Sequence, residues 1–430
     1  MTDMTLDADA SDRRRIPPAR PMAAAAMLAV ALVWGLRPAA QATAGTKARS
    51  APTTAAGETR SAPAGDLELV RITPAWDIPD GWAVMSWDAD FSAERVVLVR
   101  GTDRIEYPQP NWRTRDLFVV DEDRNARPLY GPEAGTSGDP ISRVLPAISG
   151  DGESAVFATY RQAYPQGTDL RFWVDGVGQQ VIAASGQNFD LDFPDLSRDG
   201  ERGAFVEILP LTADNFVFRM RLHAWVAASG ARMLAEYPNR HITGLAIGAD
   251  GGHVAYCLED FSEDVDRGEI RLIEPASRAD RVLLTYVGVA GPVAVSADGS
   301  AVAAFLPDTP AELGGPGTGD AGPGVYLWRE DDSVMRLDEG DGSADSRVPL
   351  TMSDDGTRVS WAGLVWTDGQ GVEEVVDPGL GAEVVNARMA GDGLHWTVWL
   401  PDGPDGPGLY RLGPAAPPEP APIWLPLALR

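Results

Sequence analysis

The sequence is poor in cysteine, histidine and basic residues, and each shortage removes a class of function. One cysteine, Cys257, excludes an internal disulfide, and its place in an apolar run predicts a buried thiol. The four histidines, His223, His241, His253 and His395, lack the spacing of a histidine-built metal site. The 36 basic residues stand against 63 acidic ones, and the formal net charge of −27 repels phosphate. We therefore expect no nucleic-acid partner.

Two motifs that mark common enzymes are also missing. There is no G-x-S-x-G pattern, which would place a serine hydrolase nucleophile on a sharp turn. The Gly-rich segment 314–319 has no lysine and no strand-to-helix context, so it predicts a flexible insertion and not a phosphate loop. We find no catalytic constellation in the sequence. A non-enzymatic role is the preferred interpretation, and the question of activity stays open.

What the sequence does contain is a short pattern that recurs six times. An alternating apolar run ends at an Asp-Gly pair, and a second apolar run follows. Glycine tolerates positive φ, and Asp or Ser side chains bond the local backbone, so the pattern predicts β-hairpins. The pairs expected to form these structural turns are Asp151 and Gly152, Asp199 and Gly200, Asp250 and Gly251, Asp298 and Gly299, Asp355 and Gly356, and Asp392 and Gly393.

The spacing of the turns indicates the blades of a propeller. Successive Asp residues of the six pairs lie 48, 51, 48, 57 and 37 residues apart, and a propeller blade takes about 40–50 residues. A second pair of apolar runs follows each hairpin, which gives four strands per unit. A divergent copy without Asp-Gly begins at Val84 and makes a seventh unit. Six blades is the alternative if that copy, or the short one near Trp361, is not a true blade.

The two ends of the repeat region complement each other. The last copy, which begins at Ala387, stops at Gly413 without a fourth strand, and the segment 67–73 is an apolar strand without a partner. A ring in which the N-terminal strand completes the last blade satisfies both ends. The sequence therefore predicts an all-β protein: a single β-propeller of about seven four-stranded blades, closed by the N-terminal strand and preceded by a disordered segment.

The hairpin motif resembles the WD40-like repeat of TolB-type periplasmic propellers. It is carried by four Ser-x-Asp-Gly segments, Ser149–Gly152, Ser197–Gly200, Ser296–Gly299 and Ser353–Gly356. The resemblance covers most of residues 66–413 and implies an exported propeller. Propellers of this type serve as binding scaffolds, as accessory domains of enzymes and, in a few cases, as enzymes. The helical N-terminal domain of TolB itself has no counterpart in this sequence.

The remaining segments suggest export. Arginines precede the apolar run 22–36, and Ala40-Gln41-Ala42 fits a signal-peptide cleavage site. Residues 1–44 are therefore predicted to be a signal peptide, or alternatively an uncleaved N-terminal membrane anchor. Residues 45–65 are predicted to be a disordered linker, 66–413 the propeller, and 414–430 a Pro-rich C-terminal tail. We expect a periplasmic, extracellular or envelope-associated protein.

Aromatic residues predicted to lie in loops suggest where a ligand binds. If the Asp-Gly turns mark one face of the ring, the loops that join the second and third strands of a blade, and one blade to the next, lie on the other. The aromatic residues assigned to this loop face are Trp76, Trp82, Tyr107, Trp112, Tyr160, Tyr164, Phe216 and Phe261. We predict that they bind a protein, a peptide or a cell-envelope glycan. Alternatively, each folds back over the ring. The sequence does not predict the oligomeric state.

Acidic residues provide an enzymatic alternative and a metal hypothesis. Carboxylates near the central channel could serve a polysaccharide hydrolase or lyase, whose chemistry needs two of them within about 5–9 Å. The acidic positions considered are Asp88, Asp90, Asp190, Asp192, Asp195 and the run 259–266. Flexible loops rich in carboxylates also suit calcium, which would be purely structural here. A solvated acidic loop is the simpler interpretation, and we predict no other cofactor.

Overall fold

A computed structural model of the chain divides into two units, Met1–Thr59 and Arg60–Arg430, and all of the described residues belong to the second. The described residues are 67–74, 82–102, 116–131, 146–161, 167–186, 190–210, 218–260, 267–308, 310–313, 322–338, 349–375, 387–400 and 403–414. Within them, no helix has the length and apolar character needed to cross a membrane. The predicted signal peptide or anchor, the linker and nearly all of the C-terminal tail lie outside these ranges.

Seven four-stranded antiparallel sheets form the blades, numbered here from the N-terminus. Blade 1 contains β2 (Trp82–Ala89), β3 (Val96–Thr102), β4 (Asp116–Val120) and β5 (Ala126–Tyr130), and blade 2 contains β6 (Ala147–Ile148), β7 (Ser154–Arg161), β8 (Gly167–Val174) and β9 (Gly178–Ala184). Blade 3 contains β10 (Asp190–Leu196), β11 (Arg202–Pro210), β12 (Phe218–Val226) and β13 (Gly230–Pro238), and blade 4 contains β14 (Arg240–Ile247), β15 (Val254–Asp260), β16 (Arg267–Ile273) and β17 (Asp280–Val287). Blade 5 contains β18 (Val293–Val295), β19 (Ala301–Leu306), β20 (Gly324–Arg329) and β21 (Val334–Arg336), and blade 6 contains β22 (Leu350–Met352), β23 (Arg358–Trp361), β24 (Leu364–Thr367) and β25 (Gly371–Glu374). Blade 7 contains β26 (Ala387–Met389), β27 (Trp396–Leu400), β28 (Gly408–Pro414) and β1 (Leu67–Arg71).

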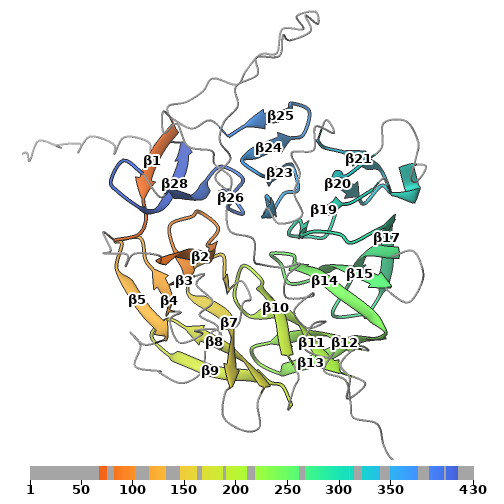
Figure 1. The fold of residues 1–430 in the computed structure, drawn as a ribbon, viewed down its shortest axis with the longest axis horizontal. Coiled ribbons are helices and arrows are strands. Elements are labelled where there is room, and N and C mark those ends of the chain that lie inside the picture. The colour runs from red at the N-terminus through yellow and green to blue at the C-terminus, as the bar shows by residue number, and fades with distance from the viewer. Residues whose placement is uncertain are drawn as a thin grey trace, which may run out of the picture. The chain divides into compact units, whose positions relative to one another are not determined.

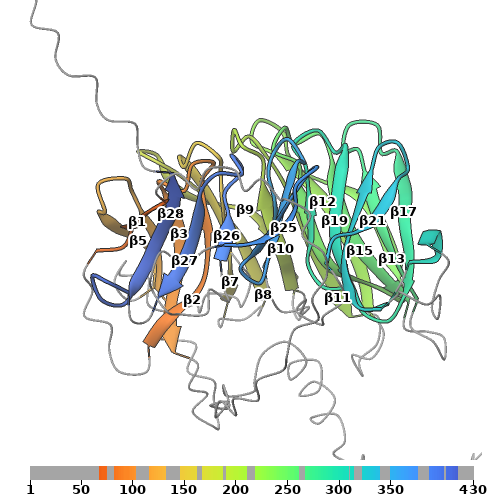
Figure 2. The same cartoon turned by 90° about the horizontal axis from the view of Figure 1, so that it is seen from above.

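The first strand of each blade lies nearest the axis of the ring. The inner strands β2, β6, β10, β14, β18, β22 and β26 contact one another in sequence, and the later strands of each blade lie progressively farther out (Figure 1). In the view turned by 90°, the blades stand side by side with their hairpin turns at two opposite faces (Figure 2). We call the face with the Asp-Gly turns the turn face and the opposite one the loop face.

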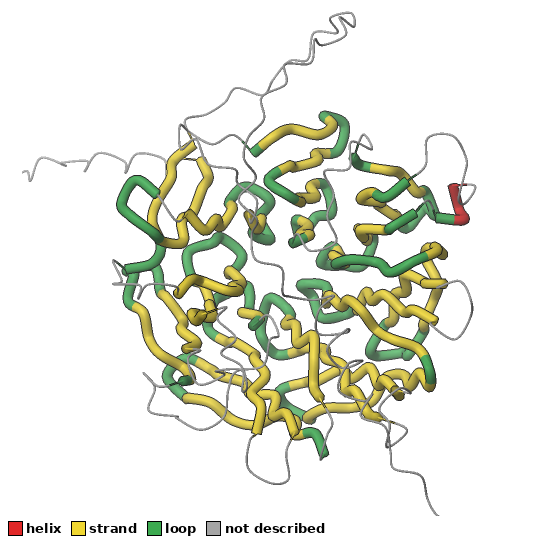
Figure 3. Tube along the Cα trace, in the orientation of Figure 1, coloured by secondary structure: helices red, strands yellow, loops and turns green. Residues whose placement is uncertain are grey.

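The prediction of seven blades closed by the N-terminal strand is confirmed, and the six-blade alternative is wrong. The divergent copy forms blade 1, and the short copy forms blade 6. Strand β1 pairs antiparallel with β28, from Leu67 opposite Pro414 to Arg71 opposite Tyr410. The two strands, orange and blue, lie side by side although they come from opposite ends of the described chain (Figure 1). Beyond the strands, the insertion 307–323 contributes one turn of 3₁₀ helix, η2 (Ala311–Leu313), the only helical segment among the described residues (Figure 3).

Apolar side chains from adjacent blades form the core. A middle strand is covered by a neighbouring blade on each face, and so β4, β19 and nearly all of β15 are buried throughout, whereas the outer strand β9 is mostly exposed. Trp225 of blade 3 lies against Phe172 of blade 2, with ring centroids 4.4 Å apart. Trp173 and Trp328 pack in the same way at other blade boundaries. Cys257 is also buried, in the core between blades 4 and 5.

Candidate functional site

The Asp-Gly turns satisfy their own polar groups. In blade 2, Asp151 Oδ1 accepts hydrogen bonds from the Ser149 hydroxyl and from the Glu153 amide, the latter at 2.9 Å. Gly152 has φ of +70°, a conformation that side chains disfavour. The Ser and Asp residues of the turns in blades 3, 5 and 6 make the same pair of contacts. The side chains at these turns therefore have local structural partners.

Blade 1 makes an equivalent turn without the motif. Asp90 takes the place of the serine, and its Oδ1 accepts the Glu94 amide at 2.8 Å. Ala93 takes the place of the glycine with φ of +56°. Burial raises the pKa of Asp90 to about 6. This explains why the blade forms although the sequence pattern is degenerate.

A closed circuit of backbone hydrogen bonds joins the seven turns. In each bond the backbone amide of the first residue donates to the backbone carbonyl of the second. The bonds are Phe91 to Gly150, Asp151 to Arg198, Arg198 to Ala249, Asp250 to Ala297, Ala297 to Asp354, Asp354 to Gly391, and Asp392 to Phe91. Each step leads from one blade to the next, and the last returns to blade 1. We call this circuit the turn belt. It fixes the turns around the axis at the turn face.

One side chain spans the axis beside the turn belt. The guanidinium of Arg198, from blade 3, lies 3.4 Å from the ring centroid of Phe91 in blade 1. The same guanidinium pairs with Asp354 of blade 6 at 2.8 Å. Blades 1, 3 and 6 are not mutually adjacent, so these contacts cross the centre of the ring. They narrow the axis at the turn face.

Farther along the axis, the polar side chains come from one equivalent position in each blade. This position is four residues before the motif Asp, or before Ser92 in blade 1. Its occupants, from blade 1 to blade 7, are Asp88, Ala147, Asp195, Ala246, Ala294, Thr351 and Arg388. We call these seven residues the axis ring.

Three members of the axis ring accept a backbone amide from the next blade. Asp88 Oδ2 accepts the Ile148 amide at 2.9 Å, and Asp195 Oδ2 accepts the Ile247 amide at 2.8 Å. The Thr351 hydroxyl oxygen accepts the Met389 amide at 3.1 Å. An inner strand has no neighbour on its axial side, so its inward amides need such partners. These side chains therefore cap the inner edges of the sheets.

Charge is concentrated among three members of the axis ring. Arg388 Nη1 lies 4.0 Å from Asp88 Oδ1, and their side chains are 15% and 30% exposed. Burial raises the pKa of Asp88 and raises that of Asp195 to about 7, and the charge of Arg388 opposes both shifts. Burial lowers the pKa of Arg388, which Asp88 and Asp195 counteract. The axis thus holds two acids that take up protons above the usual range and one arginine.

The other predicted acidic positions are distributed over separate contacts. Asp190 accepts a hydrogen bond of 3.0 Å from the Thr168 hydroxyl. Asp192 accepts a hydrogen bond from the Phe193 amide, and burial raises the pKa of Asp192 to about 6. Glu259 is fully buried and accepts the Ala290 amide at 2.6 Å. In the described part of the chain, no three acidic, cysteine or histidine side chains are grouped so that they could hold a metal ion. The acidic run 261–266 lies outside that part, so the calcium hypothesis stays a prediction.

The aromatic positions proposed for binding lie almost wholly outside the described residues. Trp76, Tyr107, Trp112, Tyr164, Phe216 and Phe261 belong to this group. The backbones of Trp82 and Tyr160 lie in β2 and β7, near the loop-face ends of these strands, and not in loops as the sequence suggested. The strands are longer than expected because they pair as far as Thr102 and Thr168. A binding role for the eight residues stays a prediction.

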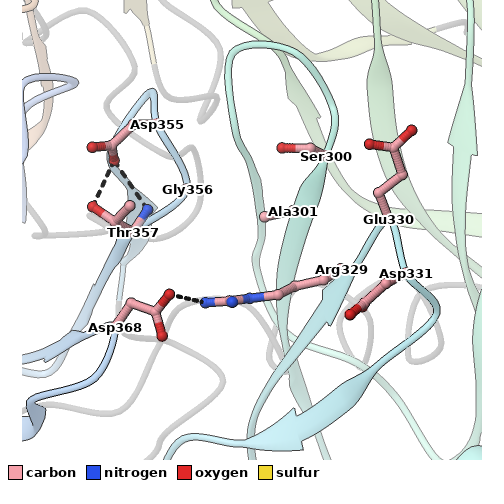
Figure 4. Close-up of a pocket in the computed structure, with 9 residues that line it drawn as sticks. All are labelled: Ser300, Ala301, Arg329, Glu330, Asp331, Asp355, Gly356, Thr357 and Asp368. Atoms are coloured by element: carbon pink, nitrogen blue, oxygen red, sulfur yellow. Dashed lines mark hydrogen bonds and ion pairs between the residues drawn. The ribbon is translucent and has the colours of Figure 1, made fainter.

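A groove of about 480 Å³ lies between blades 5 and 6 at the turn face (Figure 4). Its most prominent contact is the ion pair of Arg329 with Asp368 at 2.9 Å. Asp355, also in the groove, accepts the amide and hydroxyl of Thr357 (Figure 4). These groups already have partners, and seven of the nine residues that line the groove belong to hairpin turns. The groove is therefore a weaker candidate than the axis.

Comparison with known proteins supports the fold and does not identify a family. Neither a protein-family model nor a curated protein sequence matches this chain. Among solved structures, a puromycin-hydrolyzing peptidase from Mycobacterium tuberculosis is similar at a TM-score of 0.50 and 15% identity, over 76% of this chain and 51% of the peptidase. This chain therefore spans about half the length of that enzyme. TolB from Acinetobacter baumannii is similar at a TM-score of 0.40 and 13% identity, over 70% of this chain and 76% of TolB. An oligogalacturonate lyase in complex with manganese is similar at a TM-score of 0.39 and 13% identity, over 84% of this chain and 96% of the lyase.

The seven four-stranded blades confirm the resemblance to TolB-type propeller repeats at the level of the fold. At these identities, none of the similarities transfers an activity to this chain. The residues that the sequence reading missed are Arg198, Thr351 and Arg388. An alignment of the seven repeats on the Asp-Gly turn would have placed Arg388 and Thr351 at the position of Asp88 and Asp195. No pattern in the sequence marks Arg198, because it acts across the axis.

Proposed function

We propose that this protein is an exported, non-catalytic scaffold that binds a protein, peptide or cell-envelope glycan at the loop face of the propeller. The observation that carries the proposal is the position of the Arg198 side chain, which crosses and narrows the axis beside the turn belt. A ligand that enters along the axis must then approach from the loop face. The predicted loop aromatics are assigned to the same face, and aromatic side chains supply much of the binding energy in protein interfaces.

The acidic residues of the axis support a scaffold more than an enzyme. Both oxygens of Asp195 accept backbone amides, from Leu196 and Ile247. Asp88 likewise caps the Ile148 amide. A general acid or base must be free to contact the substrate proton, and these carboxylates have structural partners instead.

The alternative is a polysaccharide hydrolase or lyase that uses these carboxylates, and one observation favours it. The pKa of Asp195, raised to about 7 by burial, suits general acid–base chemistry at neutral pH. This alternative predicts that the protein releases oligosaccharides from envelope polysaccharides and that Asp195→Asn abolishes the release. The scaffold proposal predicts no release by either protein.

The export part of the proposal depends on the predicted signal peptide in residues 1–44. It is tested by fractionating cells that express the full chain and determining the N-terminus of the exported protein. Cleavage after Ala42 supports a signal peptide, and an intact N-terminus in the membrane fraction supports the anchor. Retention of the whole protein in the cytoplasm would contradict export.

The binding face is tested with two matched double variants. The loop-face variant carries Trp112→Ala and Tyr164→Ala. The control carries Val177→Ala and Leu394→Ala, which removes two exposed apolar side chains (84% and 45% exposed) from the turn face. We expect the loop-face variant to lose about tenfold or more in affinity for ligands found on peptide and glycan arrays, as interface anchors do. The control should bind like the wild type.

Two results would contradict the proposal. One is equal binding by the loop-face variant and the wild type. The other is a loss of binding in the turn-face control alone. Thermal unfolding of both variants provides the check on folding. The control should change stability by less than about 0.5 kcal/mol, as substitutions of exposed side chains usually do.

A further inference from the structure

We infer that the axis ring contains a binding site for a carboxylate group of a peptide, formed by Arg388 and by the backbone amides of Val295 and Met352. The inference rests on the proposed function, in which a peptide approaches from the loop face, and it specifies the chemistry of the group that is bound. The evidence is a set of hydrogen-bond donors at the axis that lack acceptors among the described residues.

Two inward amides lack the caps found elsewhere in the ring. Ser296 donates to Ala301, and by the alternation of an antiparallel pair the Val295 amide points away from β19, toward the axis. The same alternation, set by the bond from Ser353 to Arg358, directs the Met352 amide inward.

The preceding blades cannot cap these two amides. In blades 1, 3 and 6, the axis-ring side chain that accepts the next inward amide is an Asp or a Thr. In blades 4 and 5 the axis-ring position holds Ala246 and Ala294, whose side chains have no hydrogen-bond acceptor. Neither amide makes a hydrogen bond within the described part of the chain. A backbone amide withdrawn from bulk water is rarely left without a partner.

Arg388 adds a charged donor from the adjacent blade. Its Nε is buried and has no hydrogen-bond partner. Within the described part of the chain its ion pair is with Asp88 at 4.0 Å, which is too long for a hydrogen bond. A guanidinium carries five N–H donors in a planar fork that matches a carboxylate. The donors of blades 5, 6 and 7 therefore share one chemistry, and an oxyanion satisfies it.

The width of the axis favours a peptide group over a sugar ring. Near the turn face, the single side chain of Arg198 reaches both Phe91 and Asp354 across the centre. The axis-ring residues Asp88, Asp195 and Thr351 lie three residues before Phe91, Arg198 and Asp354 in the sequence. A space of this width suits a C-terminal carboxylate or an Asp or Glu side chain, each of which is one chain thick.

Asp88 and Asp195 line the axis beside Arg388, and their charges both act on its guanidinium. Their oxygens each retain a lone pair beyond the amide bonds, and can accept an N–H of the bound peptide. Burial raises the pKa of Asp195 to about 7, so near neutral pH this group holds part of a proton and repels a carboxylate less. The site is therefore compatible with an anionic group although the whole chain has a net charge of −27.

The test uses the full chain and two pairs of peptides that differ in one charge. The first pair is tri-alanine with a free C-terminal carboxylate and its C-terminal amide. The second is acetyl-Ala-Glu-Ala-amide and its Gln counterpart, so that the two pairs distinguish a C-terminal from a side-chain source. Binding is measured by calorimetry and by thermal shift up to about 20 mM peptide, which detects millimolar affinities.

We expect at least one carboxylate peptide to bind about tenfold more tightly than its neutral partner, and Arg388→Gln to remove that difference. Arg411→Gln, which alters an exposed ion pair with Glu94, is the matched control and should keep it. Ala294→Ser gives a second variant that leaves Arg388 in place. Its hydroxyl should cap the Met352 amide as Thr351 caps Met389, and so weaken the preference several-fold.

Three results would overturn the inference: no carboxylate preference in the wild type, an unchanged preference in Arg388→Gln, or an equal loss in Arg411→Gln. If the loop-face variant Trp112→Ala, Tyr164→Ala loses array ligands while Arg388→Gln binds them normally, the scaffold proposal stands and the carboxylate site does not. Occupation of the axis by water alone in a crystal grown with the free-acid peptide would also count against the site.

Discussion

At the scale of single residues, the axis ring shows how one position acquires different roles. The backbone is equivalent in all seven blades, yet Asp, Thr, Ala and Arg occupy this position. Asp88, Asp195 and Thr351 accept an amide from the next blade, whereas alanine leaves that amide uncapped. The chemistry of the axis therefore depends on which blade carries which side chain.

Asp195 gives a prediction about pH. Its folded-state pKa of about 7 exceeds the ordinary value of 3.8, so between these values the folded protein binds more protons than the unfolded chain. The contribution of this group to stability is complete below about pH 4 and is lost as the pH rises to 7. Relative to Asp195→Asn, the wild type should lose about 1 kcal/mol of unfolding free energy per pH unit between pH 5 and 7.

Urea unfolding of both proteins at pH 5, 6 and 7 measures this difference. Asp175→Asn is the control, because the hydrogen bond from Arg127 lowers the pKa of Asp175. Its contribution is lost only as the pH falls through the acidic range, so this variant should differ from the wild type by a constant amount between pH 5 and 7. A constant difference for Asp195→Asn as well would show that Asp195 stays ionised at the axis.

At the scale of elements, the Asp-Gly turn is both a local hairpin and part of a contact between blades. Gly200 has φ of +64°, and a Cβ there would lie 2.8 Å from Ser154 Cβ in blade 2. Gly176, in an outer turn, has a nearly equal φ of +68° with open space around it. Substitution of Gly176 therefore tests backbone strain alone, whereas substitution of Gly200 tests backbone strain together with steric conflict between blades.

Alanine at these two positions gives the second prediction. Gly176→Ala should cost about 1–2 kcal/mol, the penalty for a left-handed conformation. Gly200→Ala should cost roughly 2–4 kcal/mol, because overpacking against the buried serine adds to the same penalty. Thermal or urea unfolding measures both. Equal losses would mean that the neighbouring blade moves aside without cost.

The elements were largely predictable from the sequence, and the axis was not. Alternating apolar runs around Asp-Gly specify strands and turns locally, so the repeat indicated the blades and the closing strand. Blade 1 was harder to predict because Asp90 and Ala93 replace the Ser and Gly of the motif. The contacts of Arg198 with Phe91 and Asp354 join three distant segments, and no local pattern encodes such a meeting.

At the scale of the whole molecule, stability depends on the closure of the ring by β1. The Arg71 guanidinium donates to the carbonyls of Asp405, Pro407 and Pro74. The Thr73 hydroxyl accepts the Leu409 amide at 3.1 Å. These bonds attach the N-terminal segment of the ring to blade 7, beyond the pairing of β1 with β28.

Arg71→Ala gives the third prediction. The substitution removes hydrogen bonds from a buried charged group and should destabilise the protein by roughly 2–4 kcal/mol. Arg127→Ala is the control: its ion pair with Asp175 lies at the surface, where such pairs contribute about 0–1 kcal/mol. Urea unfolding measures both, and an Arg71 effect no larger than that of Arg127 would show that closure does not depend on this side chain.

The pairing of β1 with β28 also determines when the protein can finish folding. Leu409 and Thr73 are 336 residues apart, so the first strand to leave the ribosome must wait for the last one before it has a partner. Until β1 pairs with β28, blade 7 has an open outer edge that can pair with another chain. An exported protein of this design would need its whole length delivered across the membrane before the ring could close, and a chain that ended before β28 would leave β1 without a partner and the outer edge of β27 open.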